Sequence, residues 1–354
     1  MIPRRTFLGA LGAAGLTSAA TPQLWATPWI RPTAGDLKWQ CDLIETLVHP
    51  STGRSPVVTG VCLQPQGPQI AIVGDDHYVG IYDLENRRYQ QHFRAHEDWI
   101  RAANYSPSGK LLATAGNDRH LKIWDVADWQ RPQITKTHSS AIIDLAFAHQ
   151  GNQLATVGFS DELRIYDTEA GQLAGTLDCP CNDNHAVCYS ADDRWLAVGG
   201  RSGVIKIWES ATGRVLVEQP VHRQRIRSLV FTDNHWLVSA GDDQQIKIMD
   251  PNQPDQIRSL PRQSAKLFAV TLLSYQRLAT AGSDNRIHIW NLANQELLGW
   301  LEGHTGTVSS LDAMPDKMVS GSFDTQVRLW HPAPTNGAPD RQTELTPQWQ
   351  GRRR

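Results

Sequence analysis

The sequence predicts an all-β protein built from seven similar units, and two observations support this prediction. A short apolar segment ends on a large residue seven times, at Tyr82, Trp124, Tyr166, Trp208, Met249, Trp290 and Trp330. Successive spacings are 42, 42, 42, 41, 41 and 40 residues, and a period near 40 indicates a solenoid, a propeller or an array. Apolar and polar residues alternate before the large residue, as in Leu121, Lys122 and Ile123, which is the period of a β-strand.

Each unit contains four apolar runs in the same order, and no helical pattern interrupts them. The first run is followed by a turn, as in IRAANYSPSG, and the second ends at a glycine and another turn, as in KLLATAGNDR. The third run ends on the large residue, and a fourth follows it, as in GQLAGTL. Short apolar runs separated by Gly, Pro, Asn and Asp favour strands joined by tight turns. We therefore expect each unit to form a four-stranded sheet.

The two ends of the repeat array are expected to meet. After Trp330 the sequence HPAPTNGAPD contains three prolines, which cannot supply an outer ladder strand for the seventh unit. Before the first unit, CDLIETLVHP is similar to QELLGWLEGH, the outer strand of the sixth unit and its turn. We therefore expect residues about 41–48 to pair with the edge of the seventh unit, which closes a ring and removes an exposed edge.

The units resemble the WD repeats of β-transducin-type proteins, over roughly residues 41–331. The resemblance implies a seven-bladed β-propeller with four-stranded blades. It also implies a hydrogen-bonded chain of Trp, Ser or Thr, His and Asp inside a blade. Two units contain every member of that tetrad: His96, Thr114, Asp118 and Trp124 in one, and His304, Ser320, Asp324 and Trp330 in the other.

A Ser–His–Asp set also occurs in hydrolases. Here, however, the set recurs at the repeat period and lacks the strained strand–turn–helix that exposes a nucleophile in the common hydrolase fold. We therefore expect a structural role for His96, His138, His222 and His304, and we predict no catalytic residue.

The N-terminal residues are typical of an export signal. Paired arginines precede an apolar run too short to span a bilayer, small residues follow it, and no acidic residue occurs before Asp36. The string RRTFL resembles the twin-arginine signal with which bacteria export folded proteins, and the matching residues are Arg4, Arg5, Phe7 and Leu8. An amphipathic or disordered arm is the alternative interpretation.

The expected organisation has four parts. Residues 1–26 form the signal, with cleavage after Ala20 or Ala26, and residues 27–40 form a linker. The propeller spans 41–331, and the Pro-, Gly- and polar-rich tail 332–354 is expected to be disordered. This organisation predicts a periplasmic or other extracytoplasmic protein with no stable membrane anchor after cleavage.

Composition and cysteine usage limit the classes of ligand. A formal net charge of −2 argues against a nucleic-acid-binding chain. Five cysteines are too few for a disulfide scaffold. Cys179, Cys181 and His185 form a soft-ligand cluster, but structural zinc sites usually have four ligands and wider cysteine spacing. We expect no metal and no cofactor, and a disulfide involving Cys181 or Cys188 stays open.

Partner-contacting residues are expected on one rim of the ring. In the resembled family, contacts often come from the third residue after the His position and from the residue before the turn Asp. By register these positions include the aromatic Trp99, Phe159 and Phe323 and the cationic Arg201, Arg225 and Lys266. Aromatic and Arg anchors dominate many interfaces, and Arg pairs carboxylates, so a protein or an acidic peptide segment is the expected partner.

The sequence therefore predicts an exported, non-catalytic, monomeric scaffold for protein–protein interaction. Two alternatives remain: an exported propeller enzyme or metal- or cofactor-binding protein, and a cytoplasmic WD-repeat scaffold. Fold alone does not decide among them.

Overall fold

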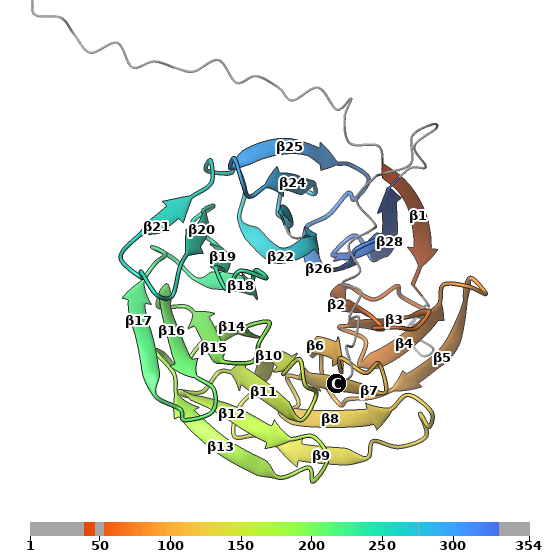
Figure 1. Ribbon diagram of the computed structural model, residues 1–354. Coiled ribbons are helices and arrows are strands. Elements are labelled where there is room, and N and C mark those ends of the chain that lie inside the picture. The colour runs from red at the N-terminus through yellow and green to blue at the C-terminus, as the bar shows by residue number, and fades with distance from the viewer. Residues whose placement is uncertain (1–38, 47–52, 275, 333–354) are drawn as a thin grey trace, which may run out of the picture. The chain divides into compact units, whose positions relative to one another are not determined.

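The computed structural model describes residues 39–46, 53–274 and 276–332. Their strands form seven four-stranded antiparallel sheets, or blades, arranged around a centre (Figure 1). This arrangement confirms the all-β, seven-bladed propeller with four-stranded blades. The sequence-based proposals for residues 1–38 and 333–354 lie outside the described residues. In the described ranges, no helix has the length and apolar character needed to cross a membrane.

The strands of each blade follow one another outward from the centre of the ring. The innermost strands are β2 (Val58–Leu63), β6 (Ile100–Tyr105), β10 (Ile142–Phe147), β14 (Asn184–Tyr189), β18 (Ile226–Phe231), β22 (Leu267–Ser274) and β26 (Val308–Met314). The second strands are β3 (Gln69–Gly74), β7 (Leu111–Gly116), β11 (Gln153–Gly158), β15 (Trp195–Gly200), β19 (Leu237–Gly241), β23 (Arg277–Gly282) and β27 (Lys317–Ser322).

The third strands end on or just after the repeated large residue. They are β4 (Tyr78–Asp83), β8 (His120–Asp125), β12 (Glu162–Asp167), β16 (Val204–Glu209), β20 (Ile246–Met249), β24 (Ile287–Asn291) and β28 (Gln326–Pro332). The outermost strands are β5 (Arg88–Arg94), β9 (Ile134–Thr137), β13 (Leu173–Asp178), β17 (Val215–Pro220), β21 (Ile257–Ser259), β25 (Glu296–Leu301) and β1 (Trp39–Glu45).

The ring is closed by the first strand, as the sequence predicted. β1 pairs antiparallel with β28, with Cys41 opposite Trp330 and Ile44 opposite Val327. In Figure 1 the first and last strands lie side by side at the outer edge of the seventh blade. The strand begins at Trp39, slightly before the expected 41–48 segment. Ile44 is buried with Val58 and other apolar residues of the first and last blades, so side-chain packing as well as backbone pairing holds the ends together.

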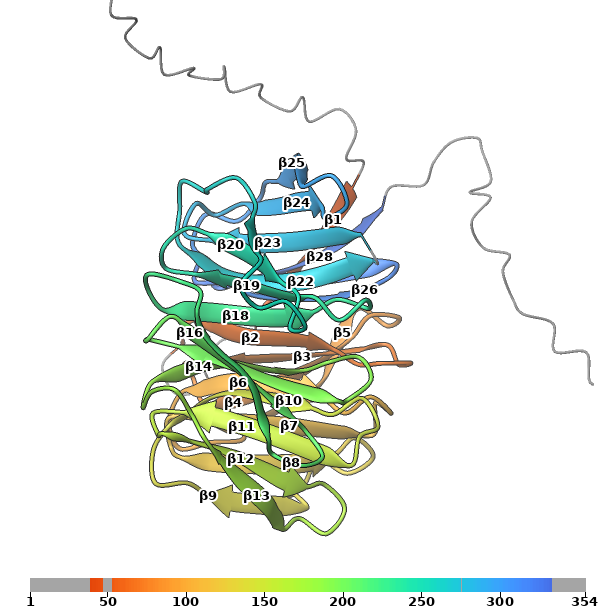
Figure 2. The same ribbon diagram turned by 60° about the vertical axis from the view of Figure 1, so that its left-hand side comes forward.

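The core lies between neighbouring blades, whose stacking around the ring is visible from the side in Figure 2. One apolar cluster, for example, joins Ala71 and Ile81 of the first blade to Leu112 and Trp124 of the second. Both faces of a blade meet a neighbour, so the second strands are buried almost continuously, as in Leu111–Gly116. The rigid frame fixes the positions of the turns at both ends of the ring.

Candidate functional site: the central cavity and its mouth

The polar tetrad of the second blade is a continuous chain of hydrogen bonds. The indole N–H of Trp124 donates to Thr114 Oγ1 over 3.0 Å, and the Thr114 hydroxyl donates to His96 Nε2 over 2.8 Å. The Nδ1–H of His96 faces the carboxylate of Asp118 at 2.9 Å. Burial lowers the pKa of His96. The neutral Nδ1–H tautomer therefore fits the donor order.

The carboxylate of the tetrad also fixes the turn. Asp118 accepts hydrogen bonds from the backbone N–H groups of Glu97 and His120. Burial alone would raise the pKa of Asp118, but these bonds and the bond from His96 lower it below its usual range. The ionised Asp118 thereby ties the loop before the innermost strand to the turn after the second strand.

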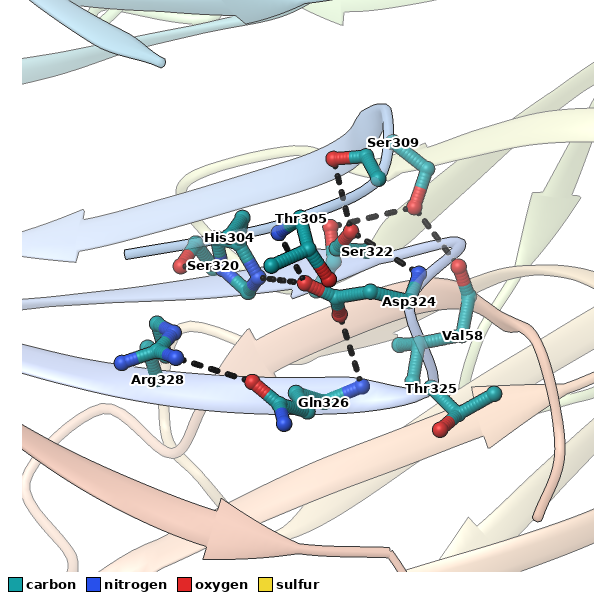
Figure 3. A network of polar contacts seen from close by, with 12 residues as sticks. Val58, His304, Thr305, Ser309, Ser320, Ser322, Asp324, Thr325, Gln326 and Arg328 are labelled. Carbon is teal, nitrogen blue, oxygen red and sulfur yellow. Dashed lines mark hydrogen bonds and ion pairs between the residues drawn. The ribbon is translucent and has the colours of Figure 1, made fainter. Parts of the chain in front are cut away.

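The seventh blade repeats this geometry, and Figure 3 shows the part of its tetrad around the Asp324 carboxylate. Trp330 donates to Ser320 Oγ over 2.8 Å. His304 lies between Ser320 at 2.7 Å and Asp324 at 2.9 Å. Asp324 also accepts the N–H groups of Thr305 and Gln326. The hydroxyl oxygens of both tetrads belong to fully buried residues. A hydroxyl enclosed in this way cannot meet a substrate, so the sets stabilise the blades.

Three further blades keep parts of this chain of hydrogen bonds. His222 contacts Ser239 at 2.7 Å and Asp243 at 2.9 Å in the fifth blade, where Met249 replaces the tryptophan. In the third blade, His138 pairs instead with the Tyr166 hydroxyl at 2.8 Å. The sixth blade keeps the hydrogen bond from the Trp290 indole to Thr280 Oγ1 at 3.0 Å. The fold is therefore kept in blades that lack one or more members of the tetrad.

Glycines hold the rim residues close to the second strands. A Cβ atom added at Gly116 would overlap the carbonyl oxygen of Trp99, and one at Gly282 would overlap that of Lys266. The seventh blade has Ser322 at this position, and its hydroxyl donates to the carbonyl of Gly306 over 3.0 Å. Close backbone contact therefore sets the positions of Trp99 and Lys266, and a side-chain hydrogen bond takes its place in the seventh blade.

A cavity of about 970 Å³ lies at the centre of the ring and is lined by residues of the innermost strands and of the adjoining turns. We call its mouth the end at which the innermost strands begin. Three rim aromatics expected from the sequence line it: Trp99, Phe159 and Phe323. Each is more than 40% exposed, at 42%, 46% and 46% respectively. The structure therefore brings these three aromatics to one opening.

The expected cationic residues are placed differently from one another. Arg225 lines the cavity, but its guanidinium pairs with Asp183 of the preceding blade at 2.7 Å. Arg201 and Lys266 are exposed and are not among the residues that line the cavity. Of the three, only Arg225 reaches the opening, and its charge is compensated there.

Sequence reasoning missed four residues of the mouth: Arg101, His185, Arg227 and Phe268. They share one repeat position, the second residue of the innermost strand, which points toward the cavity. A signal was present, because this position is polar or aromatic in six of the seven units, whereas the residue before it is apolar in six of the seven. Arg101 stacks over Trp99 with 4.9 Å to the ring centre, and Arg227 stacks over Phe268 with 5.1 Å.

Among the described residues, two partly buried carboxyl groups that line the cavity join neighbouring blades. Asp144 accepts the N–H of Val187 in the next blade at 2.9 Å, and Asp312 accepts the N–H of Leu63 at 2.8 Å. Burial raises the pKa of Asp144 to about 7 and that of Asp312 to about 6. These groups act as links between innermost strands, and they add little fixed negative charge to the cavity at mildly acidic pH.

The cysteine–histidine cluster does not converge on one point. Cys181 Sγ contacts the carbonyl of Asp183, while His185 Nε2 lies 2.8 Å from the Asp183 carboxylate. Burial lowers the pKa of His185 to about 4. Within the described ranges, no three His, Cys, Asp or Glu side chains are arranged to hold a metal ion, and all five cysteines are free thiols.

Comparisons with known proteins agree with this architecture. A family model described as the IFT122 first beta-propeller matches residues 57–330. The chain is 30% identical over 147 residues to the periodic tryptophan protein 2 homolog of Caenorhabditis elegans, a match that covers 40% of the chain and 16% of the relative.

Two further relatives carry different names. The B-type cell cycle switch protein ccs52A of Medicago truncatula is 28% identical over 166 residues, 44% of the chain and 34% of the relative. The WD repeat-containing protein srw1 of Schizosaccharomyces pombe is 27% identical over 143 residues, 38% of the chain and 26% of the relative. The matched stretches thus span about a third or less of these relatives.

Proposed function

The chain belongs to the WD-repeat propellers, in the family of the IFT122 first beta-propeller, and from this premise we propose that it is a non-catalytic scaffold that binds a partner protein at the mouth of its ring. WD-repeat propellers generally bind proteins, and loops on a rigid frame are where binding residues gather.

One observation carries the proposal: the exposed aromatic side chains gather at the mouth. Among the described residues, six large apolar side chains are exposed. The three aliphatic ones, Leu43, Leu173 and Val215, are scattered over outermost strands. The three aromatic ones, Trp99, Phe159 and Phe323, all line the cavity. Solvent-exposed aromatics around one opening are a costly surface unless a partner covers them.

The partner is a protein segment that carries acidic residues. Lys266 and Arg201 are exposed at the end of the ring where the mouth opens, and no ion pair holds either side chain within the described residues. Their charge favours encounter with an acidic segment, while the aromatics supply apolar contact.

We also propose that the protein acts outside the cytoplasm as a monomer. Arg4, Arg5, Phe7 and Leu8 support the location outside the cytoplasm, because they match the residues of a twin-arginine signal. A protein exported after folding would present the completed ring, including the strand pairing of β1 with β28, to its partner.

Chemical cross-linking tests the mouth as the binding surface. The full chain is cross-linked in the extracytoplasmic fraction of its own cells, and captured proteins are identified by mass spectrometry. We expect one protein to be captured by the wild type and by the control variant Leu173→Ala/Val215→Ala, and to be lost with Trp99→Ala/Phe323→Ala. Equal capture by both variants would show that the partner binds elsewhere.

A further inference from the structure

Three guanidinium groups line the mouth, and two of them are neutralised by carboxylates. Arg225 pairs with Asp183 at 2.7 Å. Arg227 pairs with both oxygens of Asp242, at 2.9 and 3.1 Å. Arg101 is different, since its Nε–H donates to the amide oxygen of Asn117 at 2.8 Å.

The repeat allows Arg101 in the second blade to be compared with the equivalent Arg227 in the fifth blade. Arg101 and Arg227 occupy the same position of the innermost strand in the second and fifth blades, and each stacks on an aromatic ring. Asn117 and Asp242 likewise occupy the same position after the second strand. The two blades thus hold an arginine in similar geometry, one with a neutral acceptor and the other with an anion.

Among the described residues, the guanidinium of Arg101 has no such carboxylate partner. Within residues 39–46, 53–274 and 276–332, no carboxylate lies within ion-pair distance of its guanidinium. Asp98 is close enough to raise the pKa of Arg101, but burial has the larger effect and lowers it. The Asp98 carboxylate accepts the N–H of Trp99, and Asp75, which also lines the cavity, accepts that of Val57. Arg101 therefore brings to the mouth a half-buried positive charge that has no ion-pair partner among the described residues.

We propose that Arg101, supported by Trp99, receives an aspartate or glutamate side chain of the partner protein. A guanidinium has five donors in a planar fork, and Asn117 engages one of them, so a carboxylate can still accept two parallel bonds. The aromatic rings of Trp99, Phe159 and Phe323 are placed to contact the residues on either side of that acid. This inference rests on the proposed function, and it names the group that is recognised there.

Two peptide pools measure the contribution of one acidic side chain to binding. Both are acetylated, amidated dodecapeptides with randomised positions free of Asp and Glu, and they differ only in a fixed central Glu or Gln. Because both ends are capped, the Glu side chain is the only carboxylate. The folded full chain is incubated with both pools, and bound peptides are counted by mass spectrometry. We expect the wild type to prefer the Glu pool by roughly tenfold, the scale of one charge-assisted contact.

The chain supplies its own matched variants. Asn117→Asp gives the second blade the carboxylate that the fifth blade already has, so it should remove the preference while leaving Arg101 and every aromatic in place. Arg101→Gln should remove it as well. Asp242→Asn frees Arg227 and should keep or increase the preference. Thermal unfolding of each variant verifies that it is folded. Because Asn117→Asp and Arg101→Gln should each abolish the preference, the test still works if one of them does not fold.

The outcomes separate this inference from the proposed function. A wild type that captures its protein partner but retains the two pools equally would overturn the role of Arg101 and leave the scaffold function intact. Asn117→Asp that keeps the full preference would overturn it too. If the wild type retains neither peptide pool and captures no partner protein, both proposals are overturned.

Discussion

The indole of Trp124 and the hydroxyl of Thr114 are joined by a hydrogen bond of 3.0 Å in the interior of the second blade. Thr114 is completely buried, and it is the middle member of the chain that leads through His96 to Asp118. The large residue that recurs along the sequence is thereby connected to the turn that carries the rim. Blade stability and rim geometry consequently depend on the same small group of atoms.

Replacing Thr114 by Val is expected to destabilise the protein by roughly 2–4 kcal/mol, because the buried indole N–H and His96 Nε2 both lose their partner. The measurement is chemical denaturation of the purified protein. Thr135→Val, at an exposed position of the outermost strand β9, is the control and should change stability by no more than about 0.5 kcal/mol. A similar, small effect at both positions would contradict the tetrad's structural role.

Ring closure depends on the packing of β1. Ile44 is 3% exposed, so Ile44→Ala should cost about 2–5 kcal/mol through the cavity it leaves. Amide hydrogen exchange should show faster opening of β28 than of the innermost strands. Leu43→Ala, on the opposite face of the same strand and 47% exposed, is the matched control. Uniform exchange across all blades would argue that the closing strand adds nothing special.

The link made by Asp144 predicts a pH dependence. Burial raises its pKa from 3.8 to about 7, so between these values the folded protein binds more protons than the unfolded chain. Stability contributed by this group therefore falls as pH rises from about 4 to about 7. Asp144→Asn keeps an oxygen for the Val187 N–H and removes this decline, so its stability relative to wild type should increase with pH across the window. Chemical denaturation at several pH values measures how the free energy of unfolding changes with pH, and Asp233→Asn at an exposed position is the control. Parallel pH curves for the wild type and Asp144→Asn would refute the prediction.

Close backbone approach at the rim predicts the effect of one methyl group. Gly116→Ala would force a Cβ against the carbonyl oxygen of Trp99, so we expect a loss of roughly 1–3 kcal/mol together with weaker partner capture. Gly175→Ala is the control, because nothing lies within 4 Å of the Cβ it would add. Thermal unfolding and cross-linking yield measure the two effects, and unchanged values for Gly116→Ala would be inconsistent with the described contact.

The proposed export route predicts a specific dependence on the paired arginines. Arg4→Lys/Arg5→Lys conserves the positive charge but removes both guanidinium groups. A lysine ammonium cannot replace a guanidinium at a binding site that requires its planar set of donors. The variant should accumulate in the cytoplasm, whereas the wild type should reach the extracytoplasmic fraction with a shortened N-terminus. Cell fractionation and N-terminal sequencing decide, and equal export of both proteins would point to another route or to no signal.

The sequence by itself determined the repeat and therefore the fold. A spacing of 40–42 residues between large residues, with alternation inside each run, specifies strands of similar length that stack against one another. The similarity of residues 41–48 to an outer strand predicted the partner of β28. The exposed aromatic residues Trp99, Phe159 and Phe323 followed from register, because a turn at a given repeat position lies at a given end of the ring, whereas Phe268 was missed.

Only the tertiary structure decided which charges are available. Arg225 meets Asp183 across a blade boundary, and Arg227 meets Asp242 across a turn, whereas Arg101 meets the amide of Asn117. The sequence presents all three as arginines near acidic or polar residues. Whether a guanidinium is neutralised depends on distances of a few ångströms between side chains of adjacent strands and blades, and a repeat period does not encode those distances. For the same reason, Asp144 looks like an ordinary polar residue in the sequence and becomes a link between innermost strands only when the fourth blade packs against the third.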